Sequence, residues 1–129
     1  MTSSQHVVAE FIAAVEAKDI DRALGYLAED VSYENVPMDP IVGRELTGVV
    51  LRGFLEPATE VDWQVSREIV AGNVVVNERV DRFRIGETWV EVPVVGVWEI
   101  NQDGRITLWR DYFDMETYTS QLSTLTDAG

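Results

Sequence analysis

The 129-residue sequence contains no cysteine and a single histidine, His6, close to its N-terminus. The lack of cysteine excludes disulfides, thiolate metal sites and cysteine nucleophiles. One histidine in this position argues against a Ser-His-Asp triad and against a multi-histidine metal site, so we expect no metal. We expect His6 to be exposed on the first helical turn. Any catalysis must therefore use Asp, Glu, Arg, Tyr, Asn or bound water.

Basic residues, nucleotide-binding motifs and long apolar runs are also scarce. Ten Lys and Arg face 23 Asp and Glu, a formal net charge of −13, which disfavours nucleic acid as a partner and favours solubility. No GxGxxG or Walker-type loop occurs, so we expect no cofactor. No apolar run approaches the roughly 20 residues of a membrane span, and no signal peptide is visible. We expect a cytoplasmic protein with no membrane partner.

The hydrophobic pattern predicts helices followed mostly by strands. Apolar spacing predicts a helix capped by Ser3 or Ser4, a short one carrying Leu24 and Leu27, a third over 43–56, and a short last one after Asp114. Alternation predicts strands over 31–36, 61–69, 74–85, 89–100 and 105–113.

The pattern also predicts which residues of the third helix face the core and where a strand is irregular. Leu46, Val50 and Phe54 are expected to face inward, and Pro93 and Gly96 indicate a bend or bulge. The element order predicts one α+β domain over 1–129. We expect a strongly curved, mixed or antiparallel sheet that wraps the N-terminal helices, cone-shaped with a deep pocket.

Charged residues occupy strand positions that should be buried. Side chains two apart on a strand share a face, so Arg79 and Asp81 lie on one face with Phe83, and Asp111 lies between Trp109 and Phe113. Burying an unpaired ion costs several kcal/mol, whereas one guanidinium can donate to two carboxylates. The pattern predicts an Asp–Arg–Asp cluster. A purely structural ion-pair network and a solvated strand face are the alternatives.

Two more polar side chains share a face on the first strand, Tyr33 and Asn35. With the Asp–Arg–Asp cluster they make a set of acid, base and water-holding groups. On the opposite face, Glu78, Arg82 and Arg84 are better interpreted as solvated charge.

Three segments that contain these residues resemble the limonene-1,2-epoxide hydrolase family in order and approximate spacing. They are Tyr33-Glu-Asn-Val-Pro, Glu78-Arg-Val-Asp and the longer, more specific Gly104-Arg-Ile-Thr-Leu-Trp-Arg-Asp-Tyr-Phe-Asp. The resemblance covers nearly the whole chain. It implies a curved-sheet fold of the nuclear transport factor 2-like superfamily, a homodimer and a deep apolar pocket. The chain begins closer to its first helix than family members do, which predicts that a segment closing the pocket is absent.

The resemblance also implies roles for individual residues. The catalytic triad maps onto Arg79, Asp81 and Asp111, and the water-positioning pair onto Tyr33 and Asn35. The substrate pocket maps onto Phe83, Val92, Val94, Trp109 and Phe113. The implied reaction adds water to a small cyclic, limonene-oxide-like epoxide in one acid–base step, giving a vicinal diol with no covalent intermediate. The alternatives are a ketosteroid isomerase or polyketide cyclase, and a ligand-binding or dimerisation module.

Overall fold

A computed structural model describes residues 3–128 of the chain, with side chains up to Leu125, so the ends of the predicted 1–129 domain lie outside the described residues. The described helices are α1 (Ser4–Glu16), α2 (Ile20–Leu24), α3 (Arg44–Leu55) and α4 (Met115–Ala128). The described strands are β1 (Leu27–Val36), β2 (Ile41–Val42), β3 (Glu60–Ala71), β4 (Val74–Ile85), β5 (Thr88–Ile100) and β6 (Ile106–Phe113). The predicted α+β class is confirmed.

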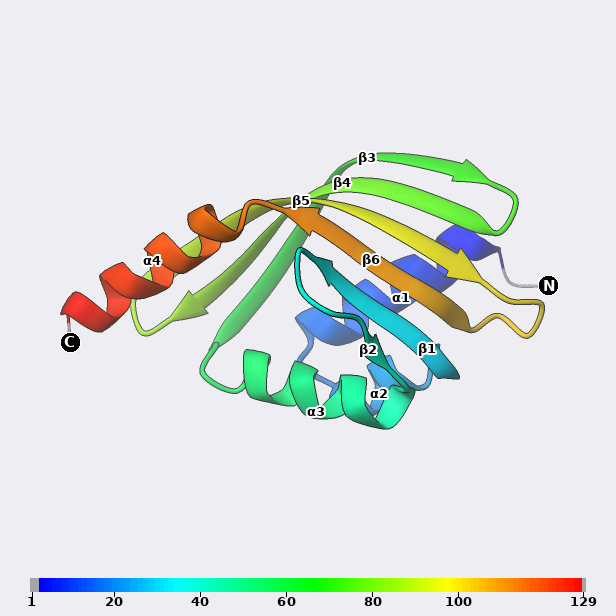
Figure 1. Cartoon of the computed structure of the whole chain (residues 1–129), viewed down its shortest axis with the longest axis horizontal. Helices are drawn as coiled ribbons and strands as arrows, with labels where there is room; N and C mark the ends of the chain where they lie inside the picture. The colour runs from blue at the N-terminus through cyan, green and yellow to red at the C-terminus, as the bar shows by residue number, and fades with distance from the viewer. Residues whose placement is uncertain (1–2, 129) are drawn as a thin grey trace.

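The strands form one mixed sheet in the order β2-β1-β6-β5-β4-β3. Strands β3 to β6 pair antiparallel as a meander, and β1 pairs with β6 in parallel. Figure 1 shows that the long strands bend and that the sheet curls over α1, α2 and α3 without closing into a barrel. The predicted curved sheet is confirmed, and its parallel pair brings the first and last strands side by side.

Helix α1 fills the inner face of this sheet. The side chain of Ser3 accepts a hydrogen bond from the backbone N–H of His6, as the predicted cap requires. Phe11 packs edge-on against Trp98 of β5 and Trp109 of β6, with ring centroids 5.6 and 5.0 Å apart. Burying an aromatic side chain of this kind stabilises the fold by roughly 1.5–3 kcal/mol. Four apolar residues at three- and four-residue spacing along α1 are all buried, namely Val8, Phe11, Ile12 and Val15.

Two helix predictions are wrong in detail. Helix α2 ends at Leu24, and Leu27 instead begins β1, where it pairs with Ile106 of β6. Leu46 of α3 does not face inward, because 52% of it is exposed. Gly48 is buried instead: a Cβ at Gly48 would lie 2.7 Å from Cδ1 of Leu24, so α3 approaches α2 through its glycine face. The other two residues predicted to face inward, Val50 and Phe54, are partly buried against the core.

Of the bend or bulge predicted at Pro93 and Gly96, the bulge is absent, whereas the long strands do bend (Figure 1). Strands β4 and β5 pair in one unbroken register, from Val74 opposite Glu99 to Ile85 opposite Thr88. Glycine in a strand also marks places where other groups approach the backbone closely, and this second meaning applies to Gly96. Within the part of the chain that the structure describes, no helix combines the length and apolarity needed to cross a membrane.

Candidate active site

The inner face of β4 carries three consecutive polar side chains, each two residues from the next. Asn77, Arg79 and Asp81 are buried between Val75 and Phe83. Arg79 is only 1% exposed, so its charge must be balanced inside the protein. The sequence pattern predicted Arg79 and Asp81 here, whereas Asn77 was not singled out.

Arg79 joins two carboxyl groups from different strands. Its Nε donates to Oδ1 of Asp81 at 2.8 Å, and its Nη2 donates to Oδ2 of Asp81 at 2.9 Å. The same Nη2 donates to Oδ2 of Asp111 on β6 at 3.0 Å. The predicted Asp–Arg–Asp cluster is therefore present, with a bidentate pair on one side and a single bond on the other.

The rest of the guanidinium is held by β3, β4 and β5. It lies over the rings of Trp63 and Trp98, 5.2 and 5.6 Å from their centroids. Its Nη1 donates to Oδ1 of Asn77 at 3.0 Å. Gly96 of β5 is opposite Asn77 on β4 and opposite Asp111 on β6.

A side chain at Gly96 would not fit beside this cluster. A Cβ there would overlap Nη1 of Arg79 and lie 3.0 Å from both Oδ1 of Asn77 and Oδ1 of Asp111. Gly96 therefore marks a close approach of side chains to the backbone, which the sequence pattern did not predict.

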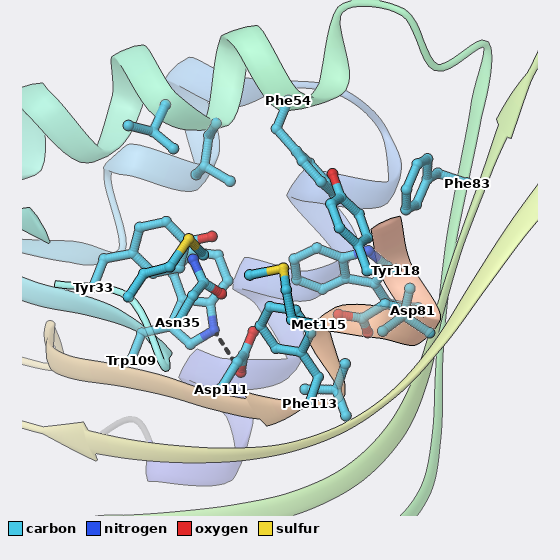
Figure 2. A pocket seen from close by; sticks show the side chains of 16 residues that line it. Tyr33, Asn35, Phe54, Asp81, Phe83, Trp109, Asp111, Phe113, Met115 and Tyr118 are labelled. Carbon is cyan, nitrogen blue, oxygen red and sulfur yellow. Dashed lines mark hydrogen bonds between the residues drawn. The ribbon is translucent and has the colours of Figure 1, made fainter. Parts of the chain in front are cut away.

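Tyr33 and Asn35 reach the site because β1 pairs with β6. In that register Asn35 is opposite Asp111, and Tyr33 is opposite Trp109. The ring of Tyr33 stacks on Trp109 with centroids 4.1 Å apart, and Nε1 of Trp109 donates to Oδ1 of Asp111 at 3.0 Å. Figure 2 shows Tyr33, Asn35 and Asp111 grouped on one side of the pocket, with Asp81 on the other. The predicted water-positioning pair, Tyr33 and Asn35, thus faces the same cavity as the two aspartates.

The cavity has a volume of about 320 Å³, the lower end of the range typical of small-ligand pockets. Every site residue predicted from the sequence lines it except Arg79, which lies behind the carboxyl groups. The remaining lining residues, which the sequence pattern did not predict, are Met38, Val50, Leu51, Phe54, Trp63, Met115 and Tyr118.

Most of these added residues belong to α3 and α4. Figure 2 shows Phe54, Phe83 and Tyr118 gathered at one end of the cavity, away from Tyr33. The rings of Phe54 and Phe83 are 5.0 Å apart, and those of Phe54 and Tyr118 are 6.0 Å apart. The pocket therefore has a polar side with two carboxyl groups and an apolar aromatic end.

Burial shifts the ionisation of the polar groups. Burial raises the pKa of Asp111 to about 6; the charge of Arg79 opposes this rise and the charge of Asp81 adds to it. Burial lowers the pKa of Arg79, but Asp111 and Asp81 outweigh it, so the net direction is upward and Arg79 stays charged. Burial and the charge of Asp111 also raise the pKa of Tyr33, which keeps its hydroxyl protonated.

The arrangement suits proton transfer in two directions at once. Asp111 has a pKa close to neutral pH and stands beside the hydroxyl and amide of Tyr33 and Asn35. Asp81 stands across the guanidinium, on the wall of the same cavity. Among the described residues, no three His, Cys, Asp or Glu side chains are grouped as metal ligands.

Comparisons with known proteins converge on one family. A family model described as the limonene-1,2-epoxide hydrolase catalytic domain matches residues 2–124. Epoxide hydrolase EphG of Mycobacterium tuberculosis (strain ATCC 25618 / H37Rv) is 38% identical over 108 residues, covering 84% of this chain and 71% of EphG.

Solved structures agree with this match. An LEH-like epoxide hydrolase from M. tuberculosis superposes with a TM-score of 0.80 at 34% identity, covering 93% of this chain and 87% of that one. A SnoaL-like protein from Shewanella denitrificans OS-217 superposes with a TM-score of 0.83 at 18% identity, covering 94% and 97% of the two chains. An NTF2-like protein from Cytophaga hutchinsonii ATCC 33406 superposes with a TM-score of 0.70 at 20% identity, covering 88% and 92% of the two chains. The last two likenesses show the fold alone, which is the curved-sheet fold that the resemblance implied.

Proposed function

Because the chain belongs to the limonene-1,2-epoxide hydrolase family and is an epoxide hydrolase, we propose that it hydrolyses a small cyclic, limonene-oxide-like epoxide in one step. The observation that carries this proposal is the single nitrogen of Arg79 that lies between two buried carboxyl groups on the wall of an apolar cavity. The product is a vicinal diol, and no covalent enzyme intermediate forms.

The reaction needs an acid and a base at the same time. The oxygen of an epoxide is a poor leaving group until it is protonated, and neutral water is a weak nucleophile. Two fully ionised aspartates could not supply a proton at neutral pH. A pair that carries one proton between its members can act as acid and base together, as in other carboxyl dyads.

Asp111 is the proposed base. Its strand neighbour Asn35 and the nearby Tyr33 bring an amide and a hydroxyl to the same side of the cavity, where a water molecule would be held. A carboxylate whose pKa is raised to about 6 is a stronger base than an ordinary aspartate and is still mostly ionised at pH 7.

Asp81 is the proposed acid. In the sheet it is opposite Trp63 on one side and Val92 on the other, so both of its neighbours across the strands are apolar side chains. Its proton passes to the ring oxygen as the C–O bond breaks. The water oxygen bonds to the carbon from the opposite side and its proton passes to Asp111. The net charge of the pair is unchanged by this step.

The cycle closes when a proton returns from Asp111 to Asp81. Both carboxyl groups contact Nη2 of Arg79, and both line the cavity, so solvent that enters after product release reaches each of them. Arg79 itself serves to offset one negative charge and to orient the two groups.

The aromatic end of the cavity supports a ring-containing substrate. Phe83, Phe54 and Tyr118 would bury the apolar body of a small cyclic epoxide, while the oxygen points towards the carboxyl groups. A cavity of about 320 Å³ favours small substrates over long-chain lipid epoxides.

A single turnover in ¹⁸O-labelled water tests the mechanism. With enzyme in excess over limonene oxide, we expect the label in the diol after the first turnover and none in the protein. Label found in Asp81 or Asp111 would mean nucleophilic attack and an ester intermediate, and would overturn the one-step mechanism. Absence of diol from limonene oxide, with turnover of another epoxide, would overturn only the substrate assignment.

The expected homodimer and cytoplasmic location are part of this proposal. The outer face of the sheet supports a dimer, because Val95 and Tyr112 lie opposite each other in the pairing of β5 with β6 and are 39% and 45% exposed. Light scattering should give twice the monomer mass, and V95K/Y112K should give the monomer mass. Cell fractionation tests the location.

A further inference from the structure

Asn77 makes contacts that the proposed reaction does not use. Its Oδ1 accepts from Nη1 of Arg79 at 3.0 Å and from Nε1 of Trp98 at 3.1 Å. Its Nδ2 donates to Oε2 of Glu68 at 3.3 Å. Glu68 in turn accepts through Oε1 from Nε2 of Gln5 at 2.9 Å. A line of hydrogen bonds thus runs from the buried guanidinium to the surface.

These partners allow only one orientation of the Asn77 amide. Arg and Trp side chains only donate, and an ionised Glu only accepts. The amide oxygen must therefore face Arg79 and Trp98, and its nitrogen must face Glu68. A reversed amide would turn its NH2 group towards the donors of Arg79 and Trp98 and its oxygen towards the carboxylate of Glu68. The hydrogen bonds to all three partners would then be lost at a buried position.

We propose that Asn77 is a positioning residue that acts through Arg79, fixing the guanidinium so that its Nη2 lies between Asp81 and Asp111. This inference rests on the proposed function of the two carboxyl groups. Asn77 lines no part of the cavity, so it acts without touching substrate.

The need for such a residue follows from the shape of the cluster. Both carboxyl groups bind the Nε and Nη2 side of the guanidinium, which leaves Nη1 to be held from elsewhere. Asn77 holds Nη1, and Gly96 leaves room for it. A neutral acceptor suits this place, since a third carboxylate would compete with Asp81 and Asp111 for the single positive charge.

A pair of nearly isosteric substitutions separates positioning from simple packing. Valine and threonine have similar shapes and both favour strands, but only threonine offers an oxygen to Arg79. We expect N77V to lower kcat by about a hundredfold, as misplacement of a catalytic group does, with KM nearly unchanged. We expect N77T to retain about tenfold more activity than N77V, even where N77V is the more stable protein.

The pH profile gives a second readout. The charged or titratable groups acting on Asp111 are Arg79 and Asp81 from β4 and Tyr33 from β1, while Glu68 of β3 faces Asn77. The charge and hydrogen bond of Arg79 lower the pKa of Asp111, and this effect weakens when the guanidinium is no longer fixed by Asn77. The acidic limb of kcat/KM should therefore move to higher pH in N77V, and by less in N77T.

Thr47 provides a matched control. It is buried in α3, and its hydroxyl has no hydrogen-bond partner among the described residues. T47V therefore also replaces a buried polar side chain by valine, but at a position that does not contact Arg79. T47V should keep wild-type kcat and the wild-type pH limb. Equal kcat for N77V, N77T and wild type, per folded molecule and with the same limb, would overturn the proposal.

The two proposals fail in different ways. If D81N and D111N lose activity while N77V keeps it, only the role of Asn77 is refuted. If D81N or D111N keeps activity, the assigned mechanism fails whatever N77V does. If N77V does not fold, W98F answers the question: it leaves Asn77 in place but removes the indole donor that orients its amide, and should lower kcat in the same direction. Wild-type kcat in W98F would then refute the role of Asn77.

Discussion

Asn35 of β1 lies directly opposite Asp111 of β6 in the parallel pairing of these two strands. Tyr33 is opposite Trp109 in the same pairing, and Trp109 donates to Asp111. Of the two carboxyl groups, Asp111 is thus the one with a neighbouring amide and hydroxyl. This asymmetry is why we assign the base to Asp111 and the acid to Asp81.

Replacing either carboxyl group by an amide should nearly abolish diol formation. D81N and D111N keep the side-chain shape, and Arg79 keeps one carboxylate and Asn77 in each variant. We expect kcat to fall by about a thousandfold or more, because the acid or the base is lost. Circular dichroism should show folded protein. Turnover within tenfold of wild type in a folded variant would contradict the assigned roles.

The pH dependence of kcat/KM should have an acidic limb near pH 6. Asp111 accepts a proton only when ionised, and its pKa is raised from 3.8 to about 6 by burial. Activity should therefore be present above pH 6 and be lost as the pH falls through that value. An initial-rate profile from pH 4.5 to 8 checks this, and undiminished activity at pH 5 would count against Asp111 as the base.

Removing the indole N–H of Trp109 should move this limb upward. The hydrogen bond from Trp109 lowers the pKa of Asp111, so W109F should raise that pKa. The position of the limb does not depend on how much protein is folded, so lost stacking on Trp98 does not confuse the result. A limb that stays in place would mean that this bond does not control Asp111.

The hydroxyl of Tyr33 should matter for turnover and little for folding. Y33F keeps the ring that stacks on Trp109 at 4.1 Å and removes only the oxygen proposed to hold water. We expect kcat to fall about ten- to a hundredfold, the value of one hydrogen bond to a reacting group. Thermal unfolding should change little. A kcat equal to wild type would show that Tyr33 does not hold the attacking water.

Adding one methyl group at Gly96 should damage the site. G96A places a Cβ against Arg79, Asn77 and Asp111, so we expect about a hundredfold loss of kcat and about 1–3 kcal/mol less stability. Gly53 of α3 is the matched control, because a Cβ there has nothing within 4 Å. G53A should keep full activity and gain about 1 kcal/mol from helix propensity. Equal behaviour of the two variants would contradict the close approach at Gly96.

Local periodicity was enough to find the central groups. Alternation along β4 and β6 placed Arg79, Asp81 and Asp111 on buried faces, because side-chain direction in a strand repeats every two residues whatever its partners are. Because burying an unpaired charge costs several kcal/mol, the pattern then predicted that these three side chains would form one ion-paired cluster. The α+β class followed from the order of helices and strands.

Only the tertiary structure decided which residues complete the site. Helix α3 approaches Leu24 of α2 through Gly48, a packing that spacing alone did not predict, and Leu46 is therefore exposed where the spacing placed it inside. The place of Asn77 beside Trp98 and Gly96 depends on the register of β4 with β5, which no local pattern encodes. The sequence by itself determined which charged side chains of β4 and β6 are buried; strand pairing and helix packing, which join residues distant along the chain, decided which of them touch.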